Sequence, residues 1–231
     1  MKALHHKLLR DLRALWSQAL TIALVVASGV AGFVTTLSAV DSLDAARERF
    51  YAEGRFADAF VSLKRAPLAL QAPLLALPGV ADVQATVEMG VRVSLPGRSD
   101  PVVGHLVGLD SRHAPRLNRV LLHDGSAAPS PGPEGAGGEL PAWVSEAFAR
   151  AHGLGPGARL QALVNGRQRT LLLRGVALAP EYVFAGLWGM PDQRGFGVFW
   201  VDAEALGAAV DLVGAFNHLA VRLAPGAEQR A

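Results

Sequence analysis

The sequence contains no cysteine among its 231 residues. This absence excludes disulfide bonds, thiolate metal sites and cysteine nucleophiles. Aromatic residues are also scarce, at 6% of the chain, and the formal net charge is only +2. Because nucleic-acid binding requires clustered basic residues together with stacking aromatics, the composition gives little support for a nucleic-acid partner.

Catalytic motifs are missing as well. The chain has no G-x-S-x-G, H-E-x-x-H or Walker A sequence. His5 and His6 are adjacent in the sequence, so their side chains point in different directions on a helix and predict no metal site. Ser145 and Glu146 begin a predicted helix, where we interpret Ser145 as the N-cap rather than as a nucleophile. The sequence therefore predicts no catalytic residue, no metal ligand and no cofactor, and we expect a protein that is not an enzyme.

Glu181 and Tyr182 are the polar pair that stands out, because the residues around them in APEYVF are apolar. We interpret the pair as a buried structural contact. The alternative is a periplasmic enzyme that uses Glu181 or a histidine, and that alternative requires a deep polar pocket around Glu181.

The sequence does contain a long apolar run. Leu20 to Val40 is uncharged over 21 residues, which as a helix reaches across roughly 30 Å of hydrocarbon. The segment before it has an excess of positive charge, whereas the rest of the chain is nearly neutral. By the positive-inside rule the N-terminus lies in the cytoplasm and most of the chain lies beyond the membrane. The charged residues of segment 1–13 are Lys2, Lys7, Arg10 and Arg13 against Asp11.

We predict a transmembrane helix over residues 16–42. A cleaved signal peptide is the first alternative, with LSA before Val40 as its cleavage site, but its apolar part normally has about 7–15 residues. A buried core helix of a soluble protein is the second. Residues 1–15 place leucines on one face and are predicted to form an amphipathic helix on the cytoplasmic surface.

The apolar run also carries small residues four positions apart. Such spacing lets membrane helices approach each other closely, so we predict that this helix packs against partner helices. The predicted packing residues are Ala27, Ser28, Ala31, Gly32 and Thr36.

The remainder of the chain alternates between strand and helix patterns, which turn and loop residues separate from one another. Asn165-Gly166 predicts a type I′ turn within a hairpin, and the run 124–138 consists almost entirely of Gly, Pro, Ala and Ser, which predicts a flexible loop. The predicted elements are a charged helix at 43–51, a strand at 57–63, a helix at 66–79, a long strand at 80–97 with a hairpin partner at 100–110, a strand around Trp143, a helix from Ser145 to Gly153, a hairpin at 158–178, and strand, helix and strand at 198–223.

This order predicts an α+β fold. Beyond the transmembrane helix we expect two α+β subdomains, the β-rich one inserted in the other. Residues 43–123 and 195–231 are assigned to the first subdomain, 139–194 to the inserted one and 124–138 to the flexible loop between them.

Six phrases of the sequence together carry a family resemblance. They are RFADAFVSLKRAP, LPGVADV, PRLNRV, VSEAFARAHGLGPGARL, NGRQRTLLLRGVALAPEYVF and FGVFWV. With these phrases the chain resembles the FtsX-like/MacB-like family of bacterial ABC-transporter permeases. The resemblance extends over essentially the whole chain, although its phrases are typical of a subfamily rather than of a substrate.

The resemblance implies a first transmembrane helix followed by a MacB-type periplasmic core domain, here residues 43–231, in the bacterial inner membrane. It also implies a mechanism, called mechanotransmission, in which a separate cytoplasmic ATPase hydrolyses ATP and the periplasmic domain moves, driving export or lipoprotein release. The implied partners are that ATPase, a second permease copy or repeat, inner-membrane lipids and a periplasmic or outer-membrane protein. Since permeases of this family have further transmembrane helices, we expect the sequence to be part of a longer unit. The alternative is a signal-anchored periplasmic binding or adaptor module.

Overall fold

The computed structural model describes residues 5, 10, 15–110, 112–113, 115–123, 126–135, 138–183, 185–186, 190 and 192–227. The chain divides into two compact units, Met1–Arg49 and Phe50–Ala231. The amphipathic helix predicted for residues 1–15 falls almost entirely outside the described residues.

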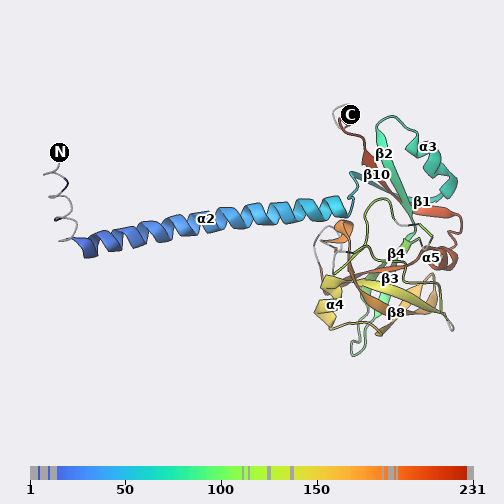
Figure 1. Ribbon diagram of the computed structural model, residues 1–231. Coiled ribbons are helices and arrows are strands. Elements are labelled where there is room, and N and C mark those ends of the chain that lie inside the picture. The colour runs from blue at the N-terminus through green and yellow to red at the C-terminus, as the bar shows by residue number, and fades with distance from the viewer. Residues whose placement is uncertain are drawn as a thin grey trace. The chain divides into compact units, whose positions relative to one another are not determined.

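A single helix, α2 (Trp16–Glu53), makes up most of the described part of the first unit (Figure 1). It runs without a break through the predicted span 16–42 and the charged extension 43–51, and it ends just before Gly54. None of its residues is buried. Among the described residues, α2 is the one helix that is long and apolar enough to cross a membrane, judged by length and composition.

The smaller sheet of the second unit has three antiparallel strands in the order β1-β10-β2. A short helical segment connects β1 to β2, and its Leu74 packs against a small core of Val83, Phe216 and Leu219. The elements are β1 (Ala59–Pro67), the 3-10 helix η1 (Leu68–Leu70), α3 (Gln71–Leu75), β2 (Val80–Thr86) and β10 (Ala215–Leu223).

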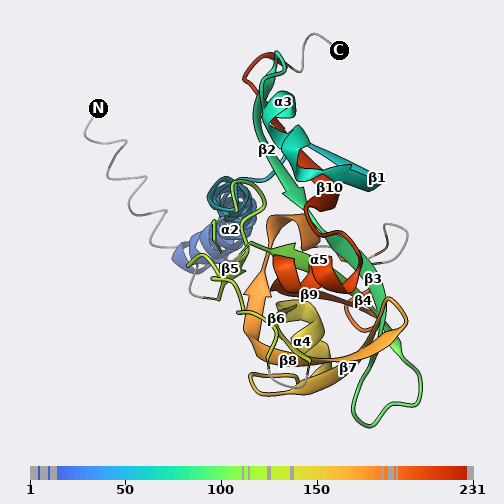
Figure 2. The ribbon, with the colours of Figure 1, turned by 90° about the vertical axis from the view of Figure 1, so that its right-hand side faces the viewer.

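The larger sheet closes into a barrel. Its strands follow the order β5-β8-β6-β9-β4-β3-β7, and β7 pairs again with β8, so six strands form a ring and β5 is attached outside it (Figure 2). The pairs β4–β9 and β6–β8 are parallel and the others are antiparallel. The elements are β3 (Glu88–Ser94), β4 (Val102–Leu109), β5 (Leu121–Leu122), β6 (Glu139–Ser145), α4 (Glu146–His152), β7 (Arg159–Val164), β8 (Arg167–Leu178), the 3-10 helix η2 (Pro180–Tyr182), β9 (Phe196–Asp202) and α5 (Ala203–Ala209).

Side chains fill the inside of the barrel. Strand β9 shows the period of two that a strand buried on both faces requires: Phe199 and Val201 belong to the interior core, whereas Val198 and Trp200 belong to a second apolar cluster. A small barrel of this strand number has room for its own side chains and little else, so its interior serves as a core.

The barrel is inserted between β2 and β10 of the smaller sheet, which confirms the predicted α+β fold with one β-rich part inserted in the other. The strand assignments within that plan need correction. Strands β3, β4 and β9, which the sequence analysis placed with the first subdomain, pair within the barrel.

The physical reason lies at Val87. The strand predicted over 80–97 is two strands, and Val87 connects β2 of one sheet to β3 of the other. The alternation of apolar and polar residues in this segment continues through the junction. Val83, Val87 and Val91 are accordingly all buried. The sequence pattern therefore gives no sign that the chain changes sheets.

Two further expectations differ from the structure. Part of the run predicted as a flexible loop packs on the barrel: Ala128 is buried in the second apolar cluster, and the Trp143 indole donates a hydrogen bond to the Pro129 carbonyl at 2.8 Å. Ser145 does precede α4, but its hydroxyl makes no capping hydrogen bond and instead accepts from the Val198 N–H at 3.2 Å.

The hairpin predicted at Asn165-Gly166 is confirmed. These residues connect β7 to β8 with φ values of 46° and 76°, and a type I′ turn requires positive φ at both positions.

Candidate functional site

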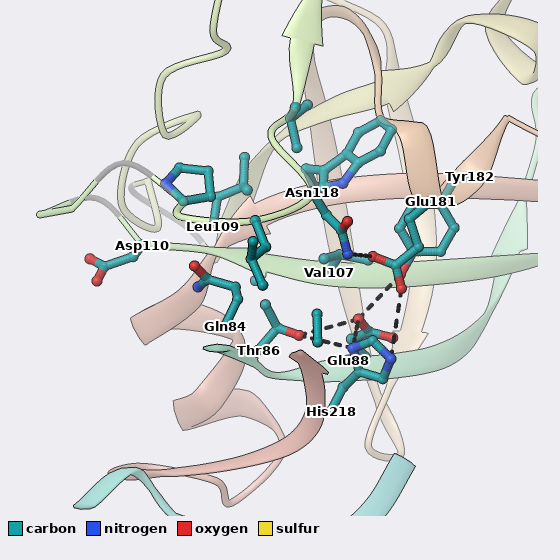
Figure 3. A pocket seen from close by; sticks show the side chains of 16 residues that line it. Gln84, Thr86, Glu88, Val107, Leu109, Asp110, Asn118, Glu181, Tyr182 and His218 are labelled. Carbon is teal, nitrogen blue, oxygen red and sulfur yellow. Dashed lines mark hydrogen bonds and ion pairs between the residues drawn. The ribbon is translucent and has the colours of Figure 1, made fainter. Parts of the chain in front are cut away.

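A cluster of polar side chains lies where the smaller sheet meets the barrel. Its members come from four separate parts of the chain, and Figure 3 shows several of them converging on one cavity. The cluster consists of Thr86 at the end of β2, Glu88 at the start of β3, His105 of β4, Glu181 and Tyr182 of η2, and His218 of β10.

Glu88 is the centre of this cluster. One carboxylate oxygen, Oε2, lies 2.8 Å from Nε2 of His105, and the other, Oε1, lies 2.8 Å from Nδ1 of His218. The Tyr182 hydroxyl donates to Oε1 at 3.1 Å, and the Thr86 hydroxyl does so at 3.3 Å. Burial by itself raises the pKa of Glu88, but the hydrogen bonds and positive charge of the two histidines outweigh it and lower the pKa to about 2. Glu88 is therefore an anion at neutral pH.

Glu181 has the opposite character. Burial, together with the negative charge of Glu88, raises the pKa of Glu181 to about 7. Its Oε2 accepts a hydrogen bond from the Asn118 side-chain amide at 2.7 Å. Its Oε1 faces Nε2 of His218 at 3.7 Å, which is too long for a hydrogen bond.

His218 lies between the two carboxylates, with one ring nitrogen directed at each. Burial lowers the pKa of His218, but the hydrogen bond to Glu88 and the charges of both carboxylates raise it overall. Burial and the neighbouring charge of Glu88 raise the pKa of Tyr182 as well, so its hydroxyl keeps the proton that it donates to Glu88. The pKa values of the two carboxyl groups are thus pushed apart within one cluster.

Asn118 connects this cluster to the start of the domain. Its side-chain oxygen accepts a hydrogen bond from the Ala57 N–H at 3.0 Å, while its side-chain nitrogen holds Glu181. Its backbone adopts a positive φ of 49°, a conformation that Asn tolerates better than most residues. The segment that follows α2 is thereby tied to the same cluster.

The cavity beside the cluster is small, about 30 Å³. That volume accommodates about two water molecules, so the cavity has room for water or a single ion rather than for an organic substrate. A deep polar pocket around Glu181, which the enzyme alternative requires, is not formed by the described residues. The cavity is lined by Gln84, Thr86, Glu88, Val107, Gly108, Leu109, Asp110, Pro115, Leu117, Asn118, Val120, Glu181, Tyr182, Trp200, His218 and Ala220.

The sequence-predicted packing residues Ala27, Ser28, Ala31, Gly32 and Thr36 are all exposed along α2. The hydroxyls of Ser28 and Thr36 donate to the Val25 and Gly32 carbonyls of the same helix at 2.8 and 2.9 Å. These polar groups are satisfied without a partner helix, and the packing role stays a prediction.

Sequence reasoning identified Glu181 and Tyr182 but missed Glu88, Asn118 and His218. These residues are distant from one another in the chain, so no spacing motif connects them. The available signal was a charge within an otherwise apolar strand, at Glu88 in ATVEMGV, and it does not reveal the partners.

No protein-family model and no curated protein sequence matches the chain. The fold is similar to that of the extracellular domain of the noncanonic ABC-type transporter YknZ from Gram-positive bacteria, with a TM-score of 0.44 and 12% identity over 74% of this chain and 85% of that one. It is also similar to the periplasmic region of MacB from Actinobacillus actinomycetemcomitans, with a TM-score of 0.41 and 9% identity over 72% and 67% of the two chains. A domain of a putative permease protein from Porphyromonas gingivalis has a TM-score of 0.38 and 18% identity over 75% and 77%. Similarity of this kind concerns the fold and does not extend to substrates or partners.

Proposed function

We propose that the chain is the N-terminal part of the permease subunit of an ABC transporter. A separate cytoplasmic ATPase hydrolyses ATP, and the extracytoplasmic domain moves in response, which drives export or lipoprotein release. The observation that carries this proposal is α2, a helix of 38 residues none of which is buried, whose apolar part is long enough to cross a membrane and which continues directly into a folded α+β domain.

The charges before α2 support an orientation of the chain with its N-terminus in the cytoplasm. Lysine and arginine exceed acidic residues in segment 1–13, which favours a cytoplasmic N-terminus. Residues 43–231 then lie outside the bacterial inner membrane. Trp16 begins the helix, at the depth where interfacial aromatics are enriched.

The character of the domain supports a mechanical rather than a catalytic role. In the described residues the polar cluster is partly buried, hydrogen-bonded and beside a cavity of only about 30 Å³. Such a cluster at the junction of two sheets holds them together, because its members come from both: His218 and Thr86 from the smaller sheet, Glu88 from the barrel. A domain built of two linked parts is suited to transmit motion.

The small residues of α2 support association with other membrane helices. They include Ala31 and Gly32, and a Cβ built on Gly32 meets no atom within 4 Å, so a partner can approach this part of the helix. A helix that only anchors a domain has no need of such a surface. We therefore include a second permease copy or repeat among the partners, beside the ATPase, inner-membrane lipids and a periplasmic or outer-membrane protein.

Purification of the native complex tests the proposal. The protein, extracted in mild detergent from the membranes of its own host, is expected to bring with it a protein that carries a Walker A sequence and hydrolyses ATP. A matched purification of the chain without residues 1–42 is expected to recover no ATPase. Recovery of the full chain without any nucleotide-hydrolysing partner, under conditions where other ABC complexes stay intact, would refute the permease assignment and favour an anchored binding or adaptor module.

A further inference from the structure

The side chains of His218 and Glu181 lie within ion-pair distance but form no hydrogen bond with each other. Nε2 of His218 and Oε1 of Glu181 face each other at 3.7 Å, beyond the range of a hydrogen bond. Two ligands bound at about 2.1 Å to one tetrahedral ion lie about 3.4 Å apart. The observed separation is therefore close to that of two ligands of one metal ion.

Glu88 contacts the other ring nitrogen of His218. Its Oε1 lies 2.8 Å from Nδ1 of His218, the nitrogen opposite to the one that faces Glu181. A histidine that binds a metal through one nitrogen almost always donates its other N–H to a carboxylate or carbonyl, which fixes the tautomer and the ring orientation. His218 has this partner already in place.

Glu181 is also held in position. Asn118 donates to its Oε2 at 2.7 Å, so Oε1 is the oxygen left to face the histidine. One ligand atom from each of Glu88, Glu181 and His218 lies within 4.8 Å of the others, and all three residues line the cavity of about 30 Å³. The cavity has room for an ion and the water that completes its coordination.

The charges of the site match a divalent cation. Glu88 and Glu181 are both largely buried, with side chains 11% and 17% exposed, and burying two carboxylates close together is unfavourable unless they are neutralised. His105 pairs with Oε2 of Glu88 at 2.8 Å, and with His105 and His218 both neutral a dication balances the two carboxylates. Imidazole nitrogen as a ligand favours zinc and similar transition metals over magnesium and calcium.

We propose that His218 Nε2 and Glu181 Oε1 bind a divalent transition-metal ion of the zinc type, with Glu88 as the positioning residue that orients His218. The ion joins the smaller sheet, which carries His218, to η2, which follows barrel strand β8 and carries Glu181. This site does not depend on the transport function proposed above, and its test requires no ATPase.

Zinc binding by the full chain tests the site. The untagged protein is prepared in detergent, stripped with a chelator and titrated with Zn²⁺ by calorimetry, in a background where His5 and His6 are both replaced by glutamine to remove adventitious binding. We expect one equivalent of saturable Zn²⁺ that millimolar Mg²⁺ does not displace. H218Q and E181Q should each weaken binding about tenfold or more, and E88Q about 10- to 100-fold. The matched control H113Q changes an exposed histidine that pairs with Asp110 and should leave the affinity unchanged.

Cobalt spectroscopy separates metal ligation from a loss of folding. Co²⁺ in the unsubstituted site should show the strong visible bands of an ion with fewer than six ligands, and at saturation E88Q should keep these bands because it keeps both ligands. H218Q should show only the weak spectrum of hydrated Co²⁺ while its thermal unfolding in chelator remains cooperative. Absence of saturable Zn²⁺ binding, affinities of H218Q and E181Q equal to that of the unsubstituted protein, or a six-coordinate oxygen-only spectrum in the unsubstituted protein would each overturn the proposal.

Discussion

The side chain of Asn217 takes the place of a neighbouring strand for the backbone of Glu88. Its Oδ1 accepts from the Glu88 N–H at 2.8 Å, and its Nδ2 donates to the Glu88 carbonyl at 2.7 Å. Glu88 is the first residue of β3, directly after the chain leaves the smaller sheet at Val87. One amide side chain of β10 thus satisfies the backbone at the point where the chain changes sheets.

We expect N217A to destabilise the domain by about 2–3 kcal/mol, because it leaves a partly buried donor and acceptor without partners. Q168A, which truncates an exposed amide side chain on β8, serves as the control and should change stability by less than about 0.5 kcal/mol. Thermal unfolding followed by circular dichroism measures both. Equal stability of N217A and the unsubstituted protein would show that the Asn217 hydrogen bonds do not hold the crossing in place.

Two glycines in adjacent barrel strands provide a second test. A Cβ on Gly104 would lie 2.5 Å from Cγ2 of Val93, whereas a Cβ on Gly90 meets nothing within 4 Å. We expect G104A to destabilise the barrel by about 1–3 kcal/mol through overpacking, and G90A to be neutral or slightly stabilising. Denaturant unfolding of the two variants should separate them, and similar midpoints would contradict the close packing of β3 against β4.

The pKa of Glu181 predicts a loss of stability as the pH rises. A carboxyl whose folded pKa is raised from 4.5 to about 7 contributes fully below about pH 4.5 and loses its contribution as the pH rises through 7. In the presence of chelator, the unsubstituted protein should therefore lose on the order of 1–3 kcal/mol relative to E181Q between pH 5 and pH 8. The exposed Glu53 provides the control: E53Q should follow the unsubstituted protein throughout.

Glu88 predicts the opposite trend at low pH. Its folded pKa of about 2 means that its contribution to stability is present above about pH 4.5 and is lost as the pH falls toward 2.

The raised pKa of His218 adds a loss of stability above pH 6.5, and this loss also occurs in E181Q. Stability curves of E181Q that decline between pH 5 and 8 as steeply as those of the unsubstituted protein would contradict the assigned environment of Glu181.

The predicted packing face of α2 can be tested by adding bulk to it. A31L and G32L should weaken association with partner membrane helices about tenfold, because close approach requires small residues. V30L, which changes a residue outside the predicted face, should leave association unchanged. Cross-linking in membranes measures the associated fraction, and an equal fraction in all three variants would remove the packing prediction.

The sequence was sufficient for elements whose signal is local. The uncharged run from Leu20 to Val40 predicted α2, and Asn165-Gly166 predicted the hairpin, since in each case neighbouring residues decide the conformation. The nested arrangement also followed from the order of strands and helices.

The division between the two sheets could not be predicted, because Val87 is as buried and as apolar as the residues of a continuous strand. The polar cluster was hidden for a related reason. His218 and Glu88 meet only after the chain has passed around the whole barrel, and each alone resembles an ordinary polar residue in a strand.

The most direct test of the proposed role as a membrane permease is the orientation of the chain in the membrane. The protein has no cysteine, so single-cysteine variants have no background: R98C lies in the exposed connection between β3 and β4, and H5C lies before α2. In spheroplasts treated with a membrane-impermeant maleimide, the account predicts labelling of R98C without lysis and of H5C only after lysis, both in the membrane fraction. Labelling of R98C only after lysis, or recovery of the protein in the soluble fraction, would contradict it.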